Sequence, residues 1–248
     1  MKNLMPNYKI IIEYDGANFV GWQQQENGES IQGTLQEAIF KLTGNKINVF
    51  GAGRTDAGVH AYAQVASFNL AKEIEIDVIR DGLNQHLRPN LISILAAEKV
   101  DEEFHARFSA KKRFYEYRII NRRSPLTINS NRAWCVHKKL NFDEMKIQSS
   151  FFIGKHDLNA FRSSHCQSKS SIKTIDSFDV QKDHEKITIT VAAKSFLHSQ
   201  VRIMVGTLVD IGKGNINRSI KEIINLKNRE FAGQTAPATG LYLKNIIY

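Results

Sequence analysis

The sequence contains few cysteines and no long apolar run, and both absences exclude classes of protein. Its two cysteines, Cys135 and Cys166, are too few for a disulfide framework, and neither belongs to a Cys-x-x-Cys pair. A histidine lies near each cysteine, but the spacing does not suit paired zinc ligands, so we expect no metal. No stretch approaches the roughly 18 apolar residues of a membrane span, and the N-terminus lacks a signal-peptide pattern. We therefore expect a cytoplasmic protein with no membrane segment.

Acidic residues are scarce in one stretch of the chain. The 248 residues include 34 Lys and Arg against 25 Asp and Glu, which gives a formal charge of +9 at pH 7. Residues 104–140 hold ten of the basic residues and one acid, Glu116, whereas the two signs balance elsewhere. A local basic patch attracts polyanions, so nucleic acid is the first partner to consider. The ten basic residues are Arg107, Lys111, Lys112, Arg113, Arg118, Arg122, Arg123, Arg132, Lys138 and Lys139.

Segments with strand and helix patterns alternate along the chain, in similar order in its two halves. In the first half the patterns predict strands at 8–14, 47–50, 62–68 and 91–97, and helices at 30–42 and around 78–87. In the second half they predict strands at 114–120, 172–180, 187–193 and 241–247, and helices at 142–153, 195–211 and 216–226. We expect an α/β protein with an N-terminal half, 1–103, and a C-terminal half, 104–248.

The most unusual segment is the glycine-rich loop at residues 51–60, Gly-Ala-Gly-Arg-Thr-Asp-Ala-Gly-Val-His, between two predicted strands. A phosphate cradle fits poorly, because the loop lacks the ending of a P-loop and Asp56 replaces the third glycine of GxGxxG. A turn in which Asp56 caps the local backbone is an alternative. Arg54 could instead hold Asp56 ionised and oriented, as a nucleophilic carboxylate requires.

This loop resembles the signature of the tRNA pseudouridine synthase A family, and the similarity extends over nearly the whole chain. The other segments that resemble family motifs are 13–16, 19–24, 31–33, 104–110, 113–117, 195–206 and 235–243. The resemblance implies that uridines 38, 39 and 40 of the tRNA anticodon stem-loop are isomerised to pseudouridine, without a cofactor. It also implies a homodimer, and a fold of two ferredoxin-like halves joined into one continuous, mostly antiparallel sheet with helices on one face.

The resemblance also implies roles for four residues. Asp56 is the nucleophile, and Arg54 is its partner in the same motif. Tyr115 lines the uracil pocket, where its ring can stack on the base and its hydroxyl can assist proton transfer from carbon 5. Arg202, on a helix, reaches the Asp56 carboxylate, and the two arginines and Tyr115 also bind the substrate. The alternatives are core packing for Tyr115 and for Tyr117, which we favour for Tyr117, and a snorkelling Arg202.

Three functions compete on this sequence. The first is an RNA-modifying isomerase. The second is a non-catalytic tRNA- or RNA-binding protein on the same scaffold, which would not need the pair formed by Arg54 and Asp56. The third is a hydrolase that uses the glycine-rich loop and would release free uracil. The full set of motifs favours the isomerase.

Overall fold

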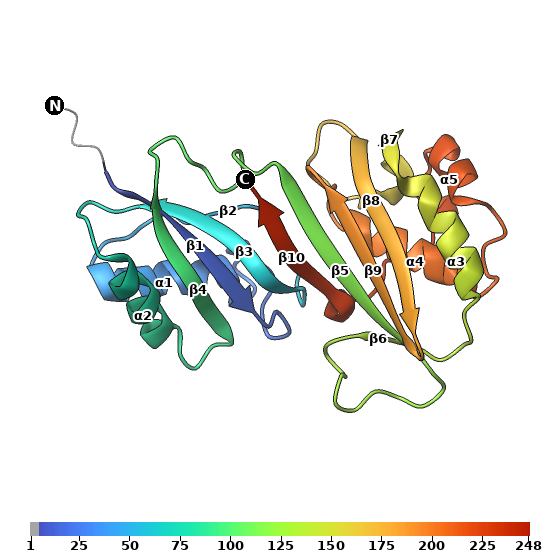
Figure 1. Cartoon of the computed structure of the whole chain (residues 1–248), viewed down its shortest axis with the longest axis horizontal. Coiled ribbons are helices and arrows are strands. Elements are labelled where there is room, and N and C mark those ends of the chain that lie inside the picture. The colour runs from blue at the N-terminus through green and yellow to red at the C-terminus, as the bar shows by residue number, and fades with distance from the viewer. Residues whose placement is uncertain (1–4) are drawn as a thin grey trace. The chain divides into compact units, whose positions relative to one another are not determined.

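The computed structural model describes residues 5–248, and the chain divides into two compact units (Figure 1). One unit comprises Met1–Lys111 with Leu243–Tyr248, and the other comprises Lys112–Tyr242. The boundary predicted after residue 103 precedes this division, and the end of the chain returns to the first unit. Helices and mostly antiparallel strands make up both units, which confirms the predicted α/β class.

The first unit is built on a sheet with strand order β4-β1-β3-β10, and β2 also pairs with β3. Strand β1 is antiparallel to both β3 and β4. The two helices pack against each other, and α2 packs against β4. The elements are β1 (Asn7–Tyr14), α1 (Ile31–Thr43), β2 (Phe50–Gly51), β3 (His60–Asn69), α2 (Ile76–Leu87), β4 (Ile92–Val100) and β10 (Leu241–Ile247), whose first two residues belong to the second unit.

The ends of α1 show why the chain folds locally as the sequence indicates. The Ser30 side chain accepts a hydrogen bond from the Gly33 N–H, and Gly44 ends the helix with a left-handed φ of 73°. The strand predicted at 47–50 is wrong for most of its length. Glutamine side chains of α1 donate to the carbonyls of Ile47 and Val49, so pairing with β3 begins only at β2.

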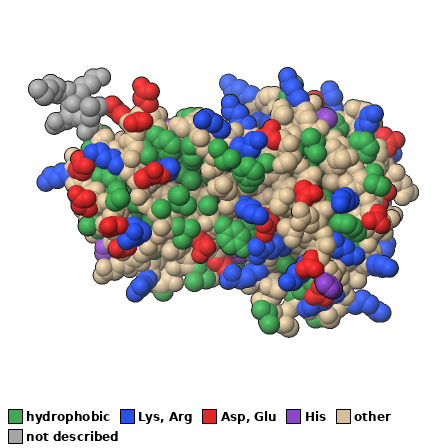
Figure 2. All heavy atoms as spheres, viewed as in Figure 1, with side chains coloured by type: hydrophobic (Ala, Val, Ile, Leu, Met, Phe, Trp, Pro, Cys, Tyr) green, Lys and Arg blue, Asp and Glu red, His purple; other side chains and the backbone are tan. Residues whose placement is uncertain are grey.

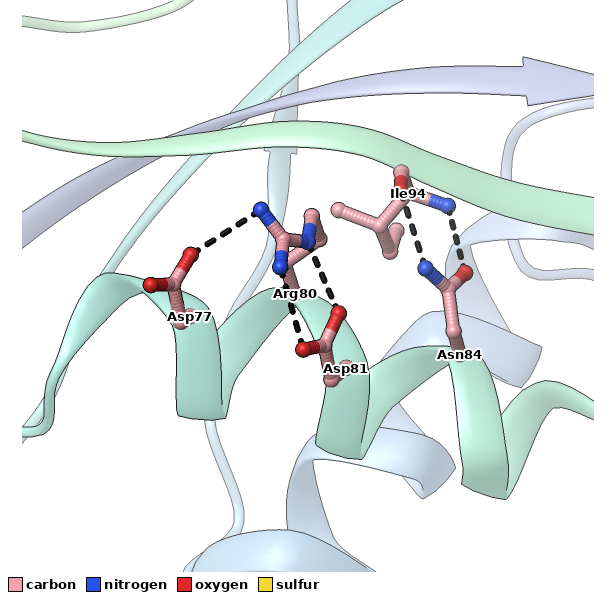
Figure 3. Close-up of polar contacts among 5 residues, drawn as sticks. All are labelled: Asp77, Arg80, Asp81, Asn84 and Ile94. Atoms are coloured by element: carbon pink, nitrogen blue, oxygen red, sulfur yellow. Dashed lines mark hydrogen bonds and ion pairs between the residues drawn. The ribbon is translucent and has the colours of Figure 1, made fainter.

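One side chain fastens α2 to the sheet (Figure 3). The Asn84 amide donates to the Ile94 carbonyl at 2.9 Å and accepts from the Ile94 N–H at 2.8 Å. On the solvent side of the same helix, Arg80 pairs with Asp77 and Asp81. Exposed pairs of this kind contribute little stability, so among these polar contacts the amide bridge is the one that joins α2 to β4, beside the packing of the buried Ile79, Leu83 and Leu87.

The second unit has strand order β5-β9-β8-β7, with antiparallel pairing throughout, and β6 runs parallel to β5. Its strands are β5 (Lys112–Asn121), β6 (Trp134–Val136), β7 (Gly154–Asp157), β8 (Ile172–Asp183) and β9 (Lys186–Ala193). Its helices are α3 (Phe142–Ser149), α4 (Gln200–Gly212) and α5 (Ile220–Leu226).

Two predicted helix starts in this unit are wrong. The helix predicted from residue 195 begins at Gln200, because Ser199 has a left-handed φ of 56° and the Gln200 side chain accepts from the Leu197 N–H. The helix predicted from residue 216 begins at Ile220, after a capping box. In that box the Ser219 hydroxyl accepts from the backbone of Glu222, and the Glu222 carboxylate accepts from the backbone of Ser219.

Candidate active site

The loop between β2 and β3 carries Arg54 and Asp56 on a backbone held by the β1–α1 connection. The Trp22 N–H donates to the Thr55 carbonyl at 3.0 Å. The hydroxyls of Tyr14 and Thr55 lie 2.8 Å apart in a buried hydrogen bond. Arg54 is exposed and Asp56 is half-buried. Thr55, which lies between them, is thus anchored through both its carbonyl and its side chain. These two contacts restrict the backbone positions of Arg54 and Asp56.

Two glycines of the β1–α1 connection let its backbone lie directly on this loop. A Cβ at Gly16 would come within 2.0 Å of the Val59 carbonyl oxygen. A Cβ at Gly21, which has a φ of +114°, would come within 2.6 Å of the Thr55 carbonyl oxygen. No side chain fits at either contact, so these glycines are needed for the close approach of the two backbone segments.

Tyr115 and Tyr117 lie on β5 in the second unit. Tyr115 is 8% exposed, and its ring meets the Phe196 ring edge-on, with centroids 5.3 Å apart. The Tyr117 side chain is fully buried, its hydroxyl donates to the Pro237 carbonyl at 2.7 Å, and burial raises its pKa. Tyr117 is therefore a core side chain, which is the interpretation that we favoured for it from the sequence.

Arg202 lies on α4, whose other residues are all buried. Its side chain is half-buried rather than extended into solvent. The guanidinium Nε donates to the Ala236 carbonyl at 2.8 Å, and the Ala236 N–H donates to the Arg202 carbonyl at 3.1 Å. The segment that contains Ala236 therefore fixes the direction of the Arg202 side chain. Arg202 is not an arginine that snorkels from the helix into solvent.

A group of α4 residues that the sequence analysis missed holds this segment in place. The buried carboxylate of Asp210 accepts from the Gln234 N–H and from the Gln234 side-chain amide, each at 3.1 Å. The Thr207 hydroxyl accepts from the Gly233 N–H at 2.9 Å. A Cβ at Gly206 would lie 1.8 Å from the Gln234 carbonyl oxygen. We call Gly206, Thr207, Asp210, Gly233 and Gln234 the α4 clamp. In the sequence, the signal for it was the presence of polar residues within an apolar helical run.

The structure distributes the ten basic residues of 104–140 among different environments. Three are paired with acids at 2.8–3.0 Å, namely Lys112 with Asp176, Arg118 with Glu116, and Arg122 with Glu185. Arg113 is buried and donates to the Lys194 carbonyl. Figure 2 shows many Lys and Arg side chains over the second unit. The exposed members of the ten are Arg107, Lys111, Arg123, Arg132, Lys138 and Lys139.

The four predicted site residues divide between the two units. Arg54 and Asp56 belong to the first unit, and Tyr115 and Arg202 belong to the second. Within residues 5–248 there is no group of three or more His, Cys, Asp or Glu side chains that could hold a metal ion. In the same range no helix has the length and apolar character needed to cross a membrane.

Comparison with known proteins gives the family. A family model described as tRNA pseudouridine synthase matches residues 10–109 and 149–248. A tRNA pseudouridine synthase A from Ehrlichia chaffeensis is 52% identical over 243 residues, which cover 97% of this chain and 99% of that protein. One from Parvibaculum lavamentivorans is 47% identical over 245 residues, which cover 98% and 100%. The chain belongs to the tRNA pseudouridine synthase family, which confirms the predicted family and the predicted enzyme class, an isomerase.

The family match does not cover the predicted site evenly. Arg54 and Asp56 lie in the first matched segment and Arg202 in the second, whereas Tyr115 lies between the two. Among solved structures, a chain of a Cbf5-Nop10-Gar1 complex is 9% identical with a TM-score of 0.37, covering 95% of this chain and 57% of that chain.

Proposed function

We propose that this protein isomerises uridine to pseudouridine at positions 38, 39 and 40 of the tRNA anticodon stem-loop, with Asp56 as the nucleophile. The observation that carries the proposal is a carboxylate on a loop anchored through Thr55, in a chain that belongs to this family. A nucleophile on a fixed backbone loses little freedom when the substrate binds, which lowers the barrier to the covalent step.

The proposed reaction breaks the bond between the ribose and nitrogen 1 of uracil and forms one to carbon 5. Carbon 5 loses a proton and nitrogen 1 gains one, so the product is an isomer and no oxidant or reductant is required. The Asp56 carboxylate adds to the base or sugar and leaves again, which retains the intermediate while the base turns. We assign the proton transfer from carbon 5 to Tyr115, and binding of the substrate to Arg54, Tyr115 and Arg202.

The proposal includes two finer expectations from the family resemblance. We propose a homodimer, for which light scattering should give about twice the chain mass of 28.2 kDa. We also keep the cytoplasm as the predicted location of the enzyme.

The proposal is tested by tritium release from a tRNA transcript labelled at carbon 5 of uridine. Wild-type protein should release tritium in metal-free buffer, and Asp56→Asn should release none while it still binds the tRNA. Asp77→Asn is a matched control, because Asp77 is an exposed carboxylate of the same unit, and it should match the wild type.

The other possible outcomes point to a different function or to a different nucleophile. Tight tRNA binding without release by the wild type, on several tRNAs with uridine at positions 38–40, would leave a non-catalytic RNA-binding protein. Free uracil as a product would indicate a hydrolase. Wild-type release by Asp56→Asn would remove Asp56 from the mechanism and leave the reaction in place.

A further inference from the structure

Three aromatic side chains form an exposed cluster on the first unit that the proposed chemistry does not use. Phe50 lies on β2, and His105 and Phe108 belong to the motif at residues 104–110. The Phe50 and His105 ring centroids are 5.0 Å apart, and those of His105 and Phe108 are 4.5 Å apart. Phe50 is 45% exposed and Phe108 is 76% exposed. We call these three residues the aromatic platform.

The platform is held at the surface through one residue of β3. Ser67 pairs with Phe50 in the β2–β3 register, and its hydroxyl accepts from the Ala106 N–H at 3.0 Å. The Ala106 carbonyl accepts from the Tyr248 hydroxyl at 2.8 Å. Both parts of the platform are therefore anchored to the sheet, and the exposed Phe108 ring belongs to an ordered, hydrogen-bonded turn.

The chemistry around the platform suits a nucleobase. The Arg107 guanidinium lies 5.7 Å from the centre of the Phe108 ring. His105 accepts from the Arg107 N–H through Nδ1, and burial lowers its pKa, so the imidazole is neutral at pH 7. Flat neutral rings beside an arginine are typical of surfaces on which unpaired bases stack, and the positive charge complements the RNA backbone.

The platform also lies close in the chain to the proposed nucleophile loop. Phe50 precedes Arg54 by four residues. Four residues of extended chain span at most about 14 Å between Cα atoms. A base on the platform would therefore belong to the same part of the RNA as the uridine at the loop.

We propose that Phe50, His105 and Phe108 form a stacking site for an unpaired nucleobase of the RNA substrate, distinct from the target uridine, with Arg107 contacting its phosphate. This inference rests on the proposed function, because it needs an RNA substrate bound at the first unit. It assigns a purpose to the motif at residues 104–110.

The test compares tRNA affinity for Phe108→Ala and Phe108→Trp at one salt concentration. Phe108→Ala should weaken binding by between about fivefold and about a hundredfold, which is the range for loss of one stacked base. Phe108→Trp should bind as the wild type does, and its indole fluorescence should be quenched when tRNA is added. Phe40→Ala is the matched control and should bind normally, because Phe40 is a phenylalanine of the same unit that is 45% exposed.

Salt dependence separates the two kinds of contact. Phe108→Ala removes no charge, so it should leave the slope of log Kd against log salt unchanged. Arg107→Ala should reduce that slope by about one. An altered slope for Phe108→Ala, or an unaltered one for Arg107→Ala, would contradict the assigned contacts.

The outcomes also distinguish this inference from the function beneath it. If the wild type releases tritium and Phe108→Ala binds tRNA equally well, the stacking site is refuted and the proposed function stands. If the wild type releases no tritium, the proposed function fails. If Phe108→Ala halves the mass found by light scattering, the platform is a contact between two copies of this chain, which also refutes the stacking site.

Discussion

Substituting one glycine of the α4 clamp should disturb Arg202, which we propose to bind the substrate, from a distance. The Gly206→Ala variant places a methyl carbon 1.8 Å from the Gln234 carbonyl oxygen, which is far closer than van der Waals contact allows. The obstacle is backbone, so the segment that contains Gln234 must move away from α4. That movement should break the two hydrogen bonds between Arg202 and Ala236.

The size of the effect can be worked from these contacts. Overpacking costs about 1–3 kcal/mol, the two hydrogen bonds contribute about 1 kcal/mol each, and alanine regains about 1 kcal/mol over glycine in a helix. The free energy of unfolding should therefore fall by about 2–4 kcal/mol in total, which lowers Tm by at least about 4 °C in a protein of this size. Because a displacement of about 1 Å can cost about a hundredfold in rate, kcat should fall more than tenfold at a temperature where the variant is folded.

Gly214→Ala is the matched control for this prediction. Gly214 follows the end of α4 with a φ of +73°, and nothing lies within 4 Å of its ideal Cβ position. Backbone strain alone should lower the free energy of unfolding of this variant by about 1 kcal/mol, and its kcat should stay within about twofold of the wild type. A wild-type Tm for Gly206→Ala would refute the close approach. A lowered Tm with unchanged kcat would show that the clamp does not position Arg202.

Three further predictions concern stability. Tyr117→Phe removes the hydrogen bond to the Pro237 carbonyl and should lower Tm by about 2–4 °C, for a loss of about 1 kcal/mol. Ser30→Ala removes the α1 cap and should cost a similar amount, whereas Ser30→Gly should cost only a few tenths of that. The Ser171 hydroxyl holds the pKa of Asp157 below its usual range, so the stability from this carboxylate is present above about pH 4 and is lost as pH falls through the lowered pKa. Asp157→Asn should therefore flatten the acid limb of a plot of Tm against pH.

Secondary structure could be predicted where local signals decide it. The final strand occurs at the predicted residues, and α1 (Ile31–Thr43) agrees with the helix predicted at 30–42 to within one residue at each end. The errors arise where side chains compete for the backbone, from 11 and 17 positions away in one case and from three positions away in the other. Glutamines of α1 take carbonyls from residues 47 and 49, which shortens the predicted strand. The apolar pattern from Leu197 onward continues without interruption, yet the Gln200 side chain bonds back to the Leu197 N–H and delays the start of α4.

The sequence proposes functional side chains more readily than it indicates the groups that hold them in place. Arg54 and Asp56 occur in a compact motif of unusual composition, so a single segment indicates their chemistry. The contacts of Arg202 depend on Ala236, 34 positions away, and on Asp210, which meets Gln234 24 positions away. Neither separation is a period of a helix or a strand, so no local pattern could have revealed these contacts. A carboxylate in an apolar helix requires partners: Lys213, three residues on, is a local one at 3.7 Å, whereas only the folded chain identifies Gln234, in the segment that contacts Arg202, as the other.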